Sequence, residues 1–139
     1  MASDTRFQRA RSPEAKRQRE EAILEAAARL GTEHGIRQIT LTELAAAVDM
    51  HKSALLRYFE TREQIFLRLT GTGWQEWSEA FRGRTSAMTR QTPTSAIADA
   101  LTDTLLARPL FCDLLAQAPL NLERNVSLEQ VRALSLIHI

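Results

Sequence analysis

The sequence predicts an all-α fold, and three observations support this prediction. Apolar residues recur at intervals of three and four, as on the buried face of a helix. Capping residues and prolines stand where these runs begin, and glycine or proline stands where several of them end. No segment shows the strict apolar and polar alternation of a half-buried strand. With 139 residues, of which 44% are hydrophobic, the chain is long enough to enclose a core.

The first helix is expected to run from about Pro13 to His34. The Ser12 hydroxyl can accept from free backbone amides, and proline suits the first helical position. Gly35 supplies the left-handed residue that often stops a helix. The buried face has helical spacing and comprises Ile23, Ala26, Ala27 and Leu30.

Residues 1–11 precede this helix and have no apolar period. They carry three arginines and predict either a flexible basic arm or an ordinary solvated terminus. Positive charge leans slightly toward the first 70 residues, which hold 12 basic and 10 acidic side chains. Over the whole chain the net charge is only +1, so the composition excludes neither a nucleic acid nor a small molecule as partner.

Two short helices are expected next. Thr40 and Glu43 have the spacing of a capping box and predict a helix of about eight residues. This helix ends before Asp49, a residue type that tolerates the left-handed conformation of a tight turn. A third helix begins near Lys52, with its apolar series at Leu55, Leu56 and Phe59. Two short helices with so brief a connection suggest a helix-turn-helix.

A long connecting helix should follow. Thr61 and Gln64 repeat the capping-box spacing, and Gly71 with Gly73 weakens the middle of the helix, which makes a bend there plausible. Its apolar face comprises Ile65, Phe66, Leu69, Trp74, Trp77 and Phe81.

Three further helices are expected after a polar linker near Arg90. Pro93 opens one of them, whose inward residues are expected to be Ile97, Leu101 and Leu105. Pro109 ends that helix and starts the next, with an apolar face of Leu110, Phe111, Leu114 and Leu115. Ser127 and Gln130 predict the cap of a last helix that carries Leu128, Val131 and Leu134.

The stretch from Leu41 to Phe66, LTELAAAVDMHKSALLRYFETREQIF, resembles the TetR family of bacterial transcriptional regulators. Several features fall in register: the Ile23 and Leu24 pair followed by alanines, Gly35, the Leu44 and Ala45 pair, the Lys52 and Leu55 spacing, the Tyr58 and Phe59 pair, and Thr61 to Glu63. The resemblance covers residues from about Arg19 to Leu69, and beyond them only the helical layout.

This resemblance implies a three-helix DNA-binding domain with a helix-turn-helix, joined by a long helix to a helical ligand-binding and dimerisation domain. The expected division is a basic arm at 1–11, the DNA-binding domain at 12–70, and part of the effector-binding and dimerisation domain at 71–139. The expected function is a sequence-specific regulator of transcription, a repressor released by a small-molecule effector. The expected partners are double-stranded operator DNA, an unknown effector and, for the full-length protein, a second copy of the chain.

The third helix is the candidate reader of the DNA. A helix fits the major groove, and this one begins with polar residues while Leu55 and Phe59 are expected to face inward. By resemblance, Thr40, Lys52, Tyr58 and Arg62 contact DNA. We assign Thr40, Tyr58 and Arg62 to phosphates, and Thr42, His51, Lys52 and Ser53 to base edges.

Some of these residues have plainer interpretations. Lys52 suits a phosphate as well as a base. Arg57 is either a phosphate contact or an ordinary exposed cation, His51 alone fits a solvated polar residue, and Tyr58 also suits helix packing. The sequence departs from the family at four positions: Asp49 replaces a turn glycine, Leu56 replaces a phosphate-binding tyrosine, and Ser53 with Ala54 replaces a frequent Gly-Thr pair. The operator sequence is therefore open.

Five residues are candidates to border an effector pocket, with plain core as the alternative: Trp74, Trp77, Phe81, Phe111 and Cys112. No catalytic residue, cofactor or metal site is expected, because the sequence has no metal-ligand spacing, phosphate-binding glycine loop or nucleophile elbow. The main rival is a helical interaction module that has lost its affinity for DNA.

The expected location is the cytoplasm. The single cysteine forms no internal disulfide, no secretory signal is visible, and no apolar run approaches the roughly 18 residues of a membrane span. Residues 134–139, LSLIHI, resemble the conceptual translation of a transposon-end adapter used in preparing sequencing libraries. We therefore expect a truncated reading frame, authentic to about Ala133, without the two further helices of the family's dimer interface.

Overall fold

We describe residues 12–118 of the protein from a computed structural model. This part of the chain folds into six α-helices and one 3-10 helix and contains no strand, which confirms the all-α prediction. The elements are α2 (Pro13–His34), η1 (Ile36–Gln38), α3 (Leu41–Ala47), α4 (Lys52–Leu55), α5 (Arg62–Thr85), α6 (Thr94–Leu106) and α7 (Pro109–Gln117). The expected arm, the helix after Ser127 and the ending at 134–139 lie outside the described residues.

The first helix begins and ends where the sequence places it. The Ser12 hydroxyl accepts a hydrogen bond from the backbone N–H of Ala15 at 3.1 Å, and Pro13 occupies the first turn. Gly35 follows the helix with a φ of 85°, a conformation that glycine adopts without steric cost. The cap and the terminal glycine therefore set both ends of α2.

The 3-10 helix η1 was not predicted. It lies between α2 and α3, and its first residue, Ile36, is almost completely buried, as is Ile39 directly after it. Three residues are too few to produce a helical period in the sequence. Burial of these two isoleucines fixes the path of the chain from Gly35 to the start of α3.

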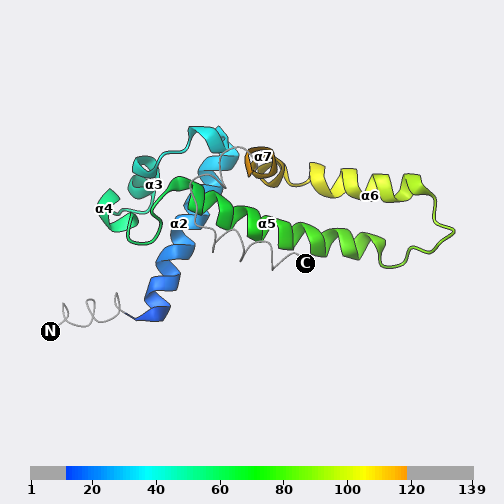
Figure 1. The fold of residues 1–139 in the computed structure, drawn as a ribbon, viewed down its shortest axis with the longest axis horizontal. Coiled ribbons are helices and arrows are strands. Elements are labelled where there is room, and N and C mark those ends of the chain that lie inside the picture. Colours follow the sequence, from blue (N-terminus) through cyan, green and yellow to red (C-terminus); the bar gives the residue numbers. More distant parts are fainter. Residues whose placement is uncertain (1–11, 119–139) are drawn as a thin grey trace.

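The hydrophobic core is shared by five elements that are neighbours in the sequence and by α7, which comes much later in the chain. Its buried residues lie on α2, η1, α3, α4 and α5 or beside them, and Leu114 of α7 is a member with 1% exposure. Helices α2 to α4 and the start of α5 form one end of the molecule, as Figure 1 shows, and α7 lies next to them. The buried members are Ile23, Ala26, Ala27, Ile36, Ile39, Leu44, Ala45, Leu55, Phe59, Ile65, Phe66 and Leu114.

Helix α5 extends away from this end, and α6 runs back beside it (Figure 1). The two glycines do not interrupt α5, which continues from Arg62 to Thr85. Packing explains why position 73 is a glycine, because a Cβ built there would lie 2.7 Å from Cδ1 of Phe111. The glycine therefore allows α7 to pack closely on α5. None of the described helices is long and apolar enough to span a bilayer.

The predicted inward face of α6 is wrong. Ile97 is 40% exposed and Leu101 is 37% exposed, while Leu105 is half-buried. The buried positions are instead Ala100 and Thr104, and the Thr104 hydroxyl donates to the carbonyl of Ala100 at 2.7 Å. Small side chains let α6 approach α5 closely, so the bulky residues lie on the other faces of the helix.

The contact between Gly73 and Phe111 predicts a clear difference between two alanine variants in α5. Gly73→Ala should lower the free energy of unfolding relative to Gly83→Ala by about 1–3 kcal/mol, the usual cost of overpacking. Gly83 is the matched control because nothing lies within 4 Å of its added Cβ, and the gain in helix propensity, about 1 kcal/mol, is common to both variants. Urea unfolding of both variants measures the difference. Equal stability would contradict the proposed close approach.

Candidate nucleic-acid interface

Helices α3 and α4 are joined by a tight turn. The N–H of Met50 donates to the carbonyl of Ala45 at 2.8 Å, and the N–H of Asp49 donates to Ala46 at 3.2 Å. Asp49 has a φ of 55°, the left-handed region that costs most residue types roughly 1–2 kcal/mol and that aspartate tolerates better than most. The structure thus contains the predicted helix-turn-helix, with the predicted left-handed residue in its turn.

Helix α4 is shorter than the sequence suggested. Regular helix ends at Leu55, and the chain continues in turns in which Arg57 donates to Ala54 and Tyr58 donates to Leu55. Leu55 is fully buried and Phe59 is 4% exposed, so the two predicted anchors do face inward. Leu56, which the sequence placed in the same apolar series, is 38% exposed and does not belong to the core.

The exposed side of α4 is polar at its start. His51 precedes the helix with an extended backbone, and Lys52 and Ser53 form its first turn. All three side chains are exposed, and so is Arg57 in the turn that follows. The predicted base-reading residues at the start of α4 are therefore all accessible to solvent.

The two threonines of α3 lie at the start of that helix. The Thr40 hydroxyl oxygen accepts from the N–H of Glu43 at 3.2 Å, which caps α3. Thr42, the second residue of the helix, is also exposed. A hydroxyl that accepts from the backbone still has its own proton to donate, so the cap leaves Thr40 able to donate to a phosphate oxygen.

Tyr58 and Arg62 both contact the rest of the protein; packing was one of the two expected roles of Tyr58, whereas the contacts of Arg62 were not expected. Tyr58 is partly buried and packs against the core. Arg62 Nη1 donates to the backbone carbonyls of Arg37 at 3.1 Å and Ile39 at 3.0 Å, and its Nε donates to Glu63. Arg62 therefore holds the segment before α3 against the start of α5, and its side chain, 39% exposed, remains accessible to solvent.

Four of the five effector-pocket candidates come together as an aromatic cluster. The rings of Trp77 and Phe81 stack with centroids 5.4 Å apart, and Trp74 meets Trp77 edge to face at 5.6 Å. Phe111 of α7 lies 6.2 Å from both tryptophans and is buried. These separations are typical of favourable aromatic pairs.

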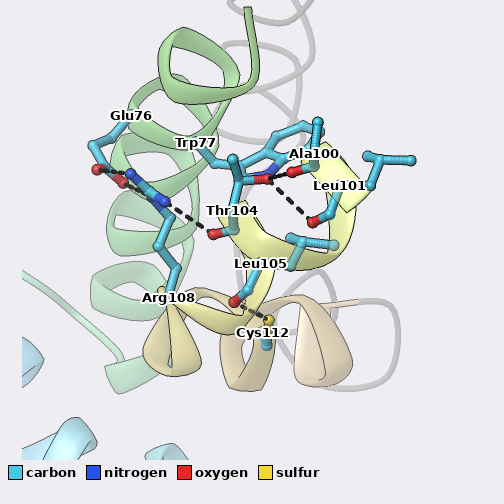
Figure 2. Close-up of polar contacts among 8 residues, drawn as sticks. All are labelled: Glu76, Trp77, Ala100, Leu101, Thr104, Leu105, Arg108 and Cys112. Atoms are coloured by element: carbon cyan, nitrogen blue, oxygen red, sulfur yellow. Dashed lines mark hydrogen bonds and ion pairs between the residues drawn. The ribbon is translucent and has the colours of Figure 1, made fainter. Parts of the chain in front are cut away.

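Cys112, the fifth candidate, is exposed. Its thiol lies 3.4 Å from the backbone carbonyl of Leu105 in α6 (Figure 2). The structure therefore places this side chain beside the corner between α6 and α7.

Polar contacts hold the three helices around this cluster together (Figure 2). Trp77 Nε1 donates to the Thr104 hydroxyl at 3.0 Å. Arg108 donates from Nε and Nη2 to the two carboxylate oxygens of Glu76, at 2.7 and 2.8 Å, and from Nη1 to the carbonyl of Thr104 at 2.9 Å. The hydrogen bonds that Glu76 accepts from Arg108 lower the pKa of Glu76 despite its partial desolvation, so the carboxylate is ionised at neutral pH.

Helix α7 also contacts the segment that leads into α3. The Asp113 carboxylate accepts from the N–H of Ile36 at 3.0 Å, and Arg37 Nε donates to Gln117 at 3.1 Å. Sequence analysis identified neither Asp113 nor Arg108. Their partners are 77 and 32 residues away, and no local pattern indicates a contact over such separations.

Two family models match the chain. Residues 23–69 match the bacterial regulatory proteins of the tetR family, and residues 72–134 match the tetracyclin repressor-like C-terminal domain. No curated protein matches the sequence. The first match contains α3 and α4, and the second contains the aromatic cluster.

Proposed function

The chain belongs to the TetR family and is a DNA-binding transcriptional regulator, and on this premise we propose that it is a repressor of operator DNA released by a small-molecule effector. The observation that supports specific binding most directly is the two-sided character of α4. Its polar first turn faces solvent while Leu55 is buried in the core. A helix held in this way presents hydrogen-bonding groups to a major groove without losing its support.

We divide the contacts between phosphates and bases. Thr40, Tyr58 and Arg62 bind phosphates, and the exposed Arg57 adds a further phosphate contact. Thr42, His51, Lys52 and Ser53 face base edges, where the hydroxyl, imidazole and ammonium groups distinguish base pairs. Because Arg62 also ties the segment before α3 to α5, its phosphate contact would fix the orientation of α3 and α4 on the duplex.

We propose residues 12–70 as the DNA-binding unit and residues 71–139 as part of the effector-binding and dimerisation unit. A homodimer presents α4 twice, about 34–36 Å apart for adjacent major grooves, and would select a palindromic or near-palindromic site. The effector site is the aromatic cluster of Trp74, Trp77, Phe81 and Phe111, with Cys112 at its edge. In this cluster Trp74, Trp77 and Phe81 are half-buried, and such side chains suit an apolar or aromatic ligand.

Release requires that the effector and the DNA prefer different arrangements of the chain. Helix α7 is the proposed connection. Phe111 lies in the aromatic cluster, and two residues later Asp113 accepts from Ile36 next to the start of α3. A ligand that displaces Phe111 would therefore shift the support of the DNA-reading helices.

The salt dependence of DNA affinity tests the proposed contact between Arg57 and a phosphate. The logarithm of the affinity for duplex DNA should fall linearly with the logarithm of the salt concentration, with a slope of about −0.9 for each phosphate bound. Arg57→Ala should flatten this slope by about one phosphate. Fluorescence anisotropy with a labelled duplex, selected by the wild-type chain from a random library, measures the slope.

The matched control is Arg82→Ala, which removes an exposed cation near the other end of α5. Its slope should equal that of the wild type. Equal slopes for wild type and Arg57→Ala would contradict the phosphate contact. Binding that selects no duplex and responds to neither variant would support an interaction module instead.

Tryptophan fluorescence tests the proposed effector site. The chain has two tryptophans, and both lie in the aromatic cluster, so their emission reports on this site alone. Any small molecule that releases the selected duplex should quench or shift this emission over the same concentration range. Trp77→Phe should weaken both effects, while Arg82→Ala should leave both unchanged. Release without any change in emission would place the effector elsewhere.

A further inference from the structure

Leu56 is an exposed apolar residue on a polar surface. It is 38% exposed, whereas its neighbour Leu55 is fully buried. In the range 12–118, the other large hydrophobic side chains with comparable or greater exposure are Ile97, Leu101 and Leu106, and all three lie on α6. Core packing therefore does not account for a leucine at position 56. The other exposed apolar side chains lie on a different helix, α6, which is distant from Leu56 in the sequence.

The backbone fixes the face on which Leu56 lies. Its N–H donates to the carbonyl of Lys52 at 3.0 Å, so Leu56 follows Lys52 by one helical turn. Residues three and four positions apart share one side of a helix, and these are Ser53 and Lys52, both exposed. Leu56 thus belongs to the surface that carries the proposed base-reading residues.

The chemistry of this surface selects one kind of partner. Lys52 and Arg57 provide positive charge beside Leu56, which suits a polyanion. The major groove of DNA combines phosphates and polar base edges with a single apolar group, the C5-methyl of thymine. A leucine between cations and hydroxyl groups matches this combination, because only an apolar side chain gains from excluding water around the methyl group.

We propose that Leu56 is a specificity-determining residue that contacts the C5-methyl group of a thymine. The inference rests on the proposed function, in which α4 enters the major groove. It adds one apolar contact to the hydrogen bonds of Lys52 and Ser53 and assigns an A·T pair to the position in the site that faces the end of α4.

Deoxyuridine tests this contact, because it differs from thymidine only by the missing methyl group. The full chain first selects duplexes from a random library, and each thymine of the selected site is then replaced in turn by deoxyuridine. At one thymine in each half-site the replacement should weaken wild-type binding about fourfold, the effect of one buried methyl group. Titration by fluorescence anisotropy gives the ratio of the two dissociation constants.

The variants assign the effect to Leu56. Leu56→Ala should bind the thymine duplex more weakly and reduce the ratio to about one, whereas Leu56→Met keeps an apolar contact and should retain most of it. Leu106→Ala, at a 75% exposed position on α6, is the matched control and should behave as the wild type. Circular dichroism checks that each variant is folded. We expect the Leu56 variants to fold, because the side chain is exposed and does not belong to the core.

The outcomes separate the two levels of the proposal. If the chain selects no duplex, the proposed function fails and this inference fails with it. If a duplex is selected but no thymine is sensitive to the methyl group, or if Leu56→Ala keeps the wild-type ratio, only the role of Leu56 is overturned. A protein partner that competes with DNA for Leu56 while the ratio stays at one would also overturn it.

Discussion

The seating of α7 against the junction of α2 and η1 is the constraint on which the rest of this structure depends. Leu114 completes the core formed by α2 to α5, and Asp113 accepts from Ile36 at 3.0 Å. As the first residue of η1, Ile36 has no hydrogen-bond acceptor within its own helix. A carboxylate from a distant helix supplies that acceptor, so the position of the segment leading into α3 is tied to the position of α7.

The same helix brings the two candidate sites into one arrangement. One side of α7 contributes Phe111 to the aromatic cluster, where Gly73 gives it room, and the bidentate contact from Arg108 to Glu76 holds its start against α5. A ligand among the aromatic rings and a duplex against α4 would therefore act on elements that α7 joins. This geometry gives the proposed repressor a physical route for coupling its two sites.

Local signals in the sequence predicted the ends of the helices, which depend on neighbouring residues, and missed the contacts and exposures that depend on tertiary packing. Caps and terminal residues such as Ser12, Gly35 and Thr61 mark helix ends because they satisfy or redirect the nearest backbone groups. The predicted inward face of α6 was wrong because the close approach of α5 and α6 favours Ala100 and Thr104 over larger apolar residues at the contact. The exposure of Leu56 and the contact from Asp113 depend on tertiary structure, which periodicity does not encode.

Amide hydrogen exchange at Ile36 tests the central role of α7 most directly. The account predicts a protected amide in the wild type, similar protection in Asp113→Asn, which keeps an acceptor oxygen, and exchange faster by roughly an order of magnitude in Asp113→Ala. The amide of Ala27, inside α2, should keep its protection in all three proteins. An unchanged rate at Ile36 in Asp113→Ala would show that α7 does not hold the entry to α3.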